Sequence, residues 1–327
     1  MLNQLTLIMP TFNRHKYALR NIGFWRTTGV RLIVLDGSAS PLCSDVIGKL
    51  GDAVFYHHLP CSITERVALA RSMLDTKYAA LIGDDDIFVH SGIREIIRFL
   101  DCHQDYVACS GRAIGFGYDD KNRVVVGNEV YPDFVGYEVA SPSPSERIKW
   151  HMENYCPSLV YSIMRSEVWA RAFDFGIIRD INFFAIEELF VESVVSCLGK
   201  SLVLPNLAWM RSRENVPVRK VTKSIDATIR FDSWWCDPDF AQEKKFFIET
   251  ASRECGMPSE HFYNAFDGYY NFCKNRTRGR RRPLSGDMPI FIKQLNALDG
   301  IKFNPFELMH ICHMVKFFHQ GISPYAD

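Results

Sequence analysis

Short apolar runs alternate with amphipathic stretches along the first hundred residues of the chain. An apolar run bounded by turn residues is typical of a buried strand, and we predict such strands at residues 5–9, 32–35, 54–56 and 78–82. Apolar positions at helical spacing predict helices at residues 13–28 (with Asn13 as the cap), 62–74 and 93–100. Continuous apolar strands separated by helices indicate a mainly parallel sheet that helices cover on both faces.

The pattern is less regular after residue 110 and becomes a series of amphipathic segments after residue 215. We predict strands at residues 123–126, 159–164 and 202–204, and helices at residues 145–154 and 187–198. The predicted C-terminal helices lie at residues 223–235, 239–254, 259–274, 287–297 and 305–319. The sequence therefore predicts an α/β domain over residues 1–215 and a helical C-terminal region over residues 216–327.

Composition and charge narrow the class of protein. The 327-residue chain is 47% hydrophobic and 23% charged, as ordinary globular proteins are. Its 38 lysines and arginines balance 38 aspartates and glutamates, so we predict no nucleic acid partner. We find no signal peptide pattern and no membrane-spanning run, and the ten cysteines form no C-x-x-C pair. These features favour reduced thiols and a cytoplasmic location.

Polar residues directly follow three of the predicted strands. Pro10 and Thr11 follow the first strand, Asp36 and Gly37 follow the second, and three consecutive aspartates at residues 84–86 follow the fourth. Open α/β sheets bind their ligands beyond the carboxyl ends of the strands. We therefore expect a ligand site where these three segments meet.

The aspartates Asp84, Asp85 and Asp86 allow two interpretations. Carboxylates on a loop suit Mg²⁺ or Mn²⁺, which also bind phosphate oxygens. Acidic residues are equally favoured at the start of a helix such as the one predicted to follow. In an extended chain Asp85 would point away from the other two, so the three could share one ion only across a turn. The chain has no P-loop and no G-x-G-x-x-G sequence, so phosphates would need a metal ion or basic side chains.

Four segments in order carry a resemblance to a known family: LIMPTFNR, LIVLDGSAS, SITERVALARSML and YAALIGDDDIF. They resemble the nucleotide-sugar-binding half of family 2 glycosyltransferases, which have the glycosyltransferase A fold. The resemblance is clear over residues 5–90 and extends more loosely to residue 213. It implies a Rossmann-like, mainly parallel nucleotide-sugar half at residues 1–110 and an acceptor half at residues 111–215.

The resemblance implies roles for residues around the donor nucleotide. The residues that would line the nucleotide pocket are Pro10, Thr11, Asn13 and Arg14. Asp36 would accept hydrogen bonds from the base, commonly uracil, and Arg66 would lie near the diphosphate. From the residues alone, Asp36 also suits an Asp-Gly turn, and Arg66 also suits an exposed helical position paired with Glu65.

Family 2 enzymes typically bind their metal ion through a D-x-D sequence, and this chain departs from the usual L-D-x-D-D pattern. Gly83 stands where the first aspartate is expected, which leaves Asp85 as the second. A shift by one residue instead makes Asp84 and Asp86 the D-x-D pair. The resemblance implies Asp85 and Asp86 as ligands of Mn²⁺ or Mg²⁺ and of the diphosphate, with Asp84 as the third candidate.

The resemblance also implies a general base at the start of a later helix. The stretch IEELFVESV offers Glu187 and Glu188 there, with Glu188 in the place of the usual aspartate and Asp180 as an alternative. The helix dipole alone would also favour these acids. At the end of KSLVLPNLAWMRSREN, Arg211 and Arg213 would approach the donor phosphates, although both also suit surface salt bridges.

These features predict a metal-dependent inverting glycosyltransferase. It would move a sugar from a nucleotide diphosphate donor, commonly a UDP-sugar, to a saccharide or glycolipid acceptor in surface polysaccharide synthesis. One alternative is a sugar nucleotidyltransferase, although PTFNRHKY lacks the glycine-rich sequence typical of that class. The other alternative is a non-catalytic protein that binds nucleotide sugars or polysaccharides.

Two C-terminal stretches are candidates for contacts with partners. Residues 274–282, KNRTRGRRR, hold six basic residues, which suit peripheral contact with anionic lipid at the inner face of the membrane or binding of a charged acceptor, and also suit a solvated loop. His310, Cys312 and His313 are close together in FELMHICHMVKFFHQ, but without a second ligand pair they favour packing over a zinc site. The apolar face of that segment also suits a contact between copies of the chain.

Overall fold

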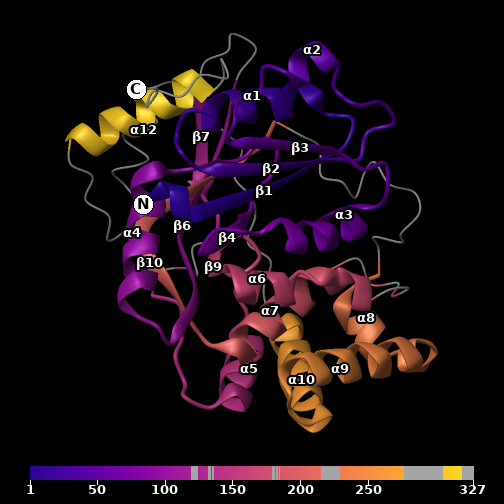
Figure 1. Cartoon of the computed structure of the whole chain (residues 1–327). Helices are drawn as coiled ribbons and strands as arrows, with labels where there is room; N and C mark the ends of the chain where they lie inside the picture. The colour runs from indigo at the N-terminus through magenta and orange to yellow at the C-terminus, as the bar shows by residue number, and fades with distance from the viewer. Residues whose placement is uncertain are drawn as a thin grey trace.

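The computed structural model describes residues 1–118, 124–131, 134, 136–178, 181, 183, 185–214, 229–275 and 305–318 (Figure 1). Three of the sequence predictions lie wholly or mostly outside these residues. They are the alternative base Asp180, the basic stretch 274–282 beyond Asn275, and the helix at 287–297.

One mixed sheet runs through the molecule in the strand order β3-β2-β1-β4-β9-β6-β10-β5, with β7 beside β6 and β8 beside β10 (Figure 1). The strands are β1 (Leu5–Thr11), β2 (Arg31–Asp36), β3 (Val54–His58), β4 (Tyr78–Leu81), β5 (Ile87–Phe88), β6 (Tyr106–Tyr118), β7 (Val124–Glu129), β8 (Glu138–Val139), β9 (Ile163–Arg165) and β10 (Lys200–Ser212). Strands β1 to β4 pair in parallel, as do β6 and β10, whereas the shorter pairings of β5, β7, β8 and β9 are antiparallel. The predicted α/β class with a mainly parallel sheet is confirmed.

Helices cover the sheet and form the C-terminal region. The α-helices are α1 (His15–Trp25), α2 (Ser44–Ile47), α3 (Ile63–Ala70), α4 (His90–Cys102), α5 (Pro144–Glu153), α6 (Ser166–Ala172), α7 (Ile186–Leu198), α8 (Phe231–Cys236), α9 (Ala241–Cys255), α10 (Ser259–Asn275) and α12 (Pro305–Phe318). Short 3₁₀ helices are η1 (Leu2–Gln4), η2 (Arg71–Met73), η4 (Phe175–Ile177) and η6 (Pro238–Phe240). The predicted helical C-terminal region is confirmed by α8, α9, α10 and α12. No helix in the described ranges is long and apolar enough to span a bilayer.

The sheet separates two hydrophobic cores because side chains alternate along each strand. In β1, Leu7 and Met9 face the core that α1, α4 and α12 complete, whereas Ile8 faces the core that α3, α5, α6, α7, α9 and α10 complete. Each fully buried aliphatic side chain of this kind contributes about 1.5–3 kcal/mol to folding. Burial on both faces explains why the N-terminal strands are continuous apolar runs and not alternating ones.

The C-terminal helices belong to these same two cores. Helices α9 and α10 lie beside α7 and α5 at the bottom of Figure 1, where Phe247 and Phe266 pack in one core with Phe190 of α7. Helix α12 lies on the opposite side beside α1. There the Phe318 ring packs edge-on against Phe24 and under the guanidinium of Arg20. A domain boundary near residue 215 stays a prediction, but the helices that follow it share the cores of the residues before it.

Strand β6 is the main element that the hydrophobic pattern did not predict. It lies between β9 and β10, but Gly111, Arg112 and Gly115 interrupt its apolar residues. The glycines are needed because a side chain at Gly111 would overlap Ala208, and one at Gly115 would overlap Arg213. Arg112 is buried and paired with Glu129 of β7. Glycines that allow close packing, and a buried ion pair, therefore stand where apolar residues would otherwise be. For this reason no apolar run marks this central strand in the sequence.

One local prediction was wrong, and another was correct only in part. Asn13 does not cap α1, because Arg14 precedes the helix directly, and Asn13 itself adopts a left-handed backbone with φ 55°. Its backbone amide donates to Ser38 Oγ, which fixes the loop against the end of β2. The predicted strand at 159–164 pairs only through Ile163 and Met164, because the amides of the preceding residues bond to a buried carboxylate, as described below.

Candidate active site

The ends of β1, β2 and β4 bring together the three polar segments that the sequence singled out. Thr11 and Asp36 are register partners at the ends of β1 and β2. The Thr11 hydroxyl donates a 2.7 Å hydrogen bond to Oδ2 of Asp84, which follows β4. Pro10 pairs with Leu35 one residue earlier in the same ladder. The expectation that these segments meet at one edge of the sheet is confirmed.

Asp36 is fully buried and accepts hydrogen bonds from several groups of the chain. Its Oδ1 accepts from the Ser38 amide at 2.9 Å, and its Oδ2 accepts from the Tyr56 hydroxyl at 2.5 Å. His15 Nε2 also lies 2.8 Å from Oδ2. Burial raises the pKa of Asp36, but these hydrogen bonds outweigh burial and hold it below the ordinary value. Contact with a nucleotide base would need some of these partners to move, so that role stays a prediction.

Arg66 ties α3 to the ends of two strands. Its Nη1 donates to the carbonyl oxygens of Thr11 at 2.5 Å and of Leu35 at 2.7 Å. The side chain is buried, so the interpretation of Arg66 as an exposed salt-bridge residue is wrong. Burial lowers the pKa of its guanidinium. Arg66 therefore holds the edge where the site lies, and its contact with a diphosphate stays a prediction.

Gly37→Ala is expected to lower the free energy of unfolding by about 1–3 kcal/mol, because a methyl group there would overlap the Arg66 guanidinium. Chemical denaturation measures this loss. Gly48→Ala is the matched control, because its added carbon would lie at an ordinary 3.5 Å from Ser44 O. We expect the control to change stability by less than about 0.5 kcal/mol. Equal stability of the two variants would contradict the packing of Arg66 over Gly37.

Arg14 faces two of the three aspartates. Its Nη2 lies 2.8 Å from Asp84 Oδ1 and 2.9 Å from Asp85 Oδ2, as close ion pairs that lack the alignment of hydrogen bonds. Burial raises the pKa of Asp84 to about 6, against the opposing charge of Arg14. Asn13, which directly precedes Arg14, has a left-handed backbone. Arg14 therefore supplies positive charge where the sequence predicted a metal ion.

Asp86 turns away from Arg14 toward β10. Its Oδ2 accepts from Trp209 Nε1 at 3.1 Å, and its Oδ1 accepts from the Ser212 amide at 2.7 Å. Burial and the neighbouring Asp85 charge raise the pKa of Asp86. A side chain carbon at Gly83 would lie only 3.1 Å from Asp86 Oδ2. The glycine that breaks the family's pattern thus leaves room for the Asp86 carboxylate.

This arrangement does not fit one divalent ion held by the three aspartates. Two carboxylates converge on Arg14, and the third is hydrogen-bonded to β10. Within the described ranges, no group of three or more histidine, cysteine, aspartate or glutamate side chains is placed to hold a metal ion. The binding of Mn²⁺ or Mg²⁺ by these aspartates therefore stays a prediction from the sequence.

The predicted base Glu188 and the predicted phosphate ligand Arg211 come from α7 and β10. Glu188, in the first turn of α7, accepts a 2.7 Å hydrogen bond from the Tyr155 hydroxyl. Arg211 of β10 donates to the Tyr131 hydroxyl. Burial lowers the pKa of Arg211, but the charges of Asp86 and Glu188 and two neighbouring tyrosines outweigh burial and raise it. Asp86 and Glu188 are therefore both close enough to Arg211 to act on it electrostatically.

The remaining candidates make other contacts. Glu187 accepts a 3.3 Å hydrogen bond from Thr64 Oγ1 of α3, and burial raises the pKa of its carboxyl. Arg213 follows β10 and packs across Gly115 of β6. Asp180 lies outside the described residues. Of the candidate bases in the described ranges, Glu188 is the one that acts on Arg211.

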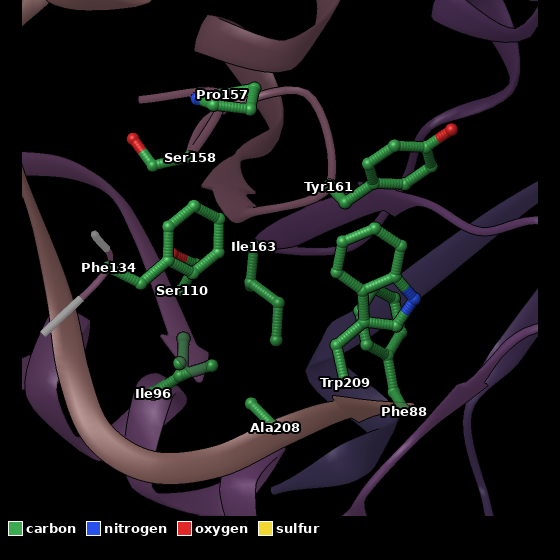
Figure 2. A pocket seen from close by; sticks show the side chains of 11 residues that line it. Phe88, Ile96, Ser110, Phe134, Pro157, Ser158, Tyr161, Ile163, Ala208 and Trp209 are labelled. Atoms are coloured by element: carbon green, nitrogen blue, oxygen red, sulfur yellow. The ribbon is translucent and has the colours of Figure 1, made fainter. Parts of the chain in front are cut away.

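Two aromatic rings form a wall beside the cluster. The rings of Tyr161 and Trp209 stack with their centroids 4.6 Å apart, and the Arg211 guanidinium lies 5.6 Å from the Trp209 ring. Figure 2 shows both rings at the border of a mainly apolar cavity, with the Tyr161 hydroxyl and the indole nitrogen of Trp209 directed away from Phe134. The polar atoms of the wall therefore point out of the cavity, and the indole nitrogen of Trp209 reaches Asp86.

Sequence reasoning missed the aromatic residues of this site. Tyr131, Tyr155 and Tyr161 lie in connecting segments, where no periodicity marks a side chain's direction. Trp209 could have been found, because alternation along a strand places it on the same face as Arg211. The missed residues orient or surround the predicted ones.

Comparisons with known proteins give a resemblance in shape. No protein-family model and no curated protein matches the chain. Residues 1–349 of S. aureus TarS give a TM-score of 0.46 at 12% identity, over 83% of this chain and 90% of that one. The same protein in complex with UDP-GlcNAc gives a TM-score of 0.47 at 12% identity, over 97% of this chain and 88% of that one. Another S. aureus TarS structure gives 0.44 at 12% identity over 84% of this chain, which spans 56% of that protein. Such low scores carry no information about the reaction.

Proposed function

We propose that the chain is a glycosyltransferase that uses a nucleotide diphosphate sugar, commonly a UDP-sugar, as its donor. The observation that carries this proposal is that Asp86, from the loop after β4, and Glu188, from α7, both act on Arg211 of β10. Arg211 is then a cation that can stabilise a leaving diphosphate, and Glu188 beside it is a carboxylate that can accept a proton from the acceptor. The resemblance to family 2 glycosyltransferases supports the same reaction.

The proposed reaction is a single displacement at the anomeric carbon of the donor sugar. The bond from that carbon to the diphosphate oxygen breaks, a bond to the acceptor oxygen forms, and the acceptor proton passes to Glu188. Attack from the face opposite the diphosphate inverts the anomeric centre. Arg211 stabilises the charge that develops on the leaving diphosphate, because a guanidinium matches phosphate oxygens.

The proposal assigns no step to a metal ion. Family resemblance implies Mn²⁺ or Mg²⁺, but Arg14 already faces Asp84 and Asp85. The acceptor we propose is a saccharide or glycolipid, as in surface polysaccharide synthesis, with contact at the cytoplasmic face of a membrane through residues 274–282. Lys274 and Asn275 are the described residues of that stretch.

Donor binding is expected to raise the melting temperature in a panel of nucleotide sugars. A ligand at 100 times its dissociation constant stabilises the folded state by about 2.7 kcal/mol. The measurement is made with Mn²⁺ and with EDTA. Equal shifts in both would indicate that basic side chains suffice, whereas a shift with Mn²⁺ alone would indicate that an ion displaces Arg14. No shift with any nucleotide sugar would contradict the proposed function.

Turnover separates the proposal from the two alternatives. Release of free nucleoside diphosphate together with transferred or hydrolysed sugar supports a glycosyltransferase. Formation of pyrophosphate from a nucleoside triphosphate and a sugar phosphate would identify a sugar nucleotidyltransferase. Binding of a nucleotide sugar without turnover, across a panel of saccharide acceptors, would indicate a binding protein.

A further inference from the structure

Helix α7 carries a second carboxylate one turn after Glu188. Residues four apart share one helix face, so Glu192 lies below Glu188 on the same side. Glu192 is completely buried, and its Oε1 accepts the backbone amides of Leu159 at 3.0 Å and Val160 at 3.3 Å. Its Oε2 lies 2.8 Å from Nε2 of His151, which is also completely buried. A carboxylate so deep in the protein needs these partners.

The partners of Glu192 continue into a chain of polar groups. His151 Nδ1 lies 2.5 Å from the Tyr137 hydroxyl. The contact between His151 and Glu192 is close but is not aligned as a hydrogen bond. Burial and the Glu192 charge raise the pKa of Tyr137, so that side chain stays neutral. These groups hold residues 155–161, which connect α5 to β9, against α7.

Residues 155–161, which we call the tyrosine segment, carry a tyrosine at each end. Tyr155 is buried, its hydroxyl donates to Glu188 Oε1, and its ring lies 4.7 Å from that of Tyr269 in α10. Burial and the charges of Glu188 and Glu192 raise the pKa of Tyr155 well above its ordinary value. Tyr155 therefore keeps its proton and remains a hydrogen-bond donor to Glu188 at any pH near neutrality.

The other end of the tyrosine segment reaches the opposite side of the site. Tyr161 stacks on Trp209, whose indole donates to Asp86. Glu192 binds the segment between these ends, through the amides of Leu159 and Val160. One buried carboxylate therefore fixes both the donor to the predicted base and the ring beside the predicted phosphate ligand.

We propose that Tyr155 is a positioning residue for Glu188, and that Glu192 holds it in place through the tyrosine segment. This inference rests on the proposed function, in which Glu188 accepts the acceptor's proton. A hydrogen bond donated to a carboxylate stabilises its charged form, which is the form that a general base needs. The same bond fixes the orientation of the carboxylate toward the reacting hydroxyl.

The test is the pH profile of kcat/KM for sugar transfer in Tyr155→Phe. This variant keeps the ring packing and removes only the donor to Glu188. Activity that depends on an ionised base rises with pH along the acidic limb of the profile. Loss of the donor raises the pKa of Glu188 and therefore moves this limb to higher pH. Hydrogen bonds to charged groups imply a shift of about one pH unit. The KM for the donor is expected to stay within about twofold, because Tyr155 contacts the base and not Arg211.

Tyr269→Phe is the matched control. It makes the same chemical change in the ring packed against Tyr155, but its hydroxyl bonds toward Cys273 and not Glu188. We expect its acidic limb to coincide with that of the wild type. A second variant, Glu192→Gln, keeps an oxygen for the two amides and removes the charge facing His151. We expect it to lower both the melting temperature and kcat/KM, because the tyrosine segment is no longer held against α7; its acidic limb is not the readout, since loss of the Glu192 charge by itself lowers the pKa of Glu188.

The outcomes separate this inference from the proposed function. A wild type without sugar transfer would overturn the proposed function itself. An active wild type, with an unshifted limb in a folded Tyr155→Phe variant, would overturn the positioning role alone. An equal shift in Tyr269→Phe would also overturn it, because ring packing would then explain the effect. A shift in Tyr155→Phe together with an unchanged melting temperature and an unchanged kcat/KM in Glu192→Gln would overturn the role of Glu192.

Discussion

Glu188→Gln is expected to lower the rate of sugar transfer by about 10²–10⁴-fold, with little change in donor binding. The amide has the shape of the carboxylate and can still accept the Tyr155 hydroxyl, but it cannot take a proton from an acceptor. Single-turnover measurements with a saturating donor give the rate of transfer, and a thermal-shift titration gives donor affinity. A loss confined to the rate would place Glu188 in the chemical step.

Glu187→Gln is the matched control for this variant. Its carboxylate precedes that of Glu188 by one residue, but it bonds to Thr64 of α3 and not to Tyr155. We expect a loss of less than about tenfold, because that contact is with another helix and not with the Arg211 cluster. A larger loss in Glu187→Gln than in Glu188→Gln would transfer the role of base to Glu187.

Arg211→Met is expected to lower kcat/KM by about 10²–10³-fold through lost stabilisation of the leaving diphosphate. Methionine fills similar apolar space beside Trp209 but carries no charge for the phosphate oxygens. The same change removes the Arg211 charge, which opposes the rise in the pKa of Asp86, so that pKa rises further. The measurement is steady-state kinetics over a range of donor concentrations, with circular dichroism as the check on folding.

Arg213→Met tests whether position or charge alone matters. It removes an equal charge two residues later, from a side chain that packs across Gly115. Its effect on kcat/KM is expected to stay below about tenfold, because the Asp86 and Glu188 charges act on Arg211. If both variants lost activity equally, a general attraction for the donor would explain the result better than a contact with the diphosphate.

The N-terminal half of the fold could be predicted because its strands are buried on both faces. Such strands are continuous apolar runs, and the residues that end them lie at one edge of a parallel sheet. Thr11, Asp36 and Asp84 could therefore be placed together before their contacts were known. The start of α7, and with it Glu188, followed from a long apolar helix with acids in its first turn.

The remaining parts of the site depend on contacts between residues far apart in the chain. The pairing of Arg14 with Asp84 joins residues 70 positions apart, and Trp209 reaches Asp86 across 123. Alternation along an extended chain predicts that the side chains of Asp84 and Asp86 point the same way. A turn at Gly83 instead directs them to different partners. Periodicity describes local direction and carries no information about such partners.

Helix α12 has a consequence for how the chain folds during synthesis. It is the last described element in chain order but fills the core between α1 and β6, and its Val315 carbonyl accepts the Tyr118 hydroxyl at 2.8 Å. The first half of the sheet therefore leaves the ribosome with part of its apolar surface uncovered, because α12 is synthesised after every other described element that packs on this core. Until that helix is released, the surface is exposed to chaperones and to neighbouring nascent chains.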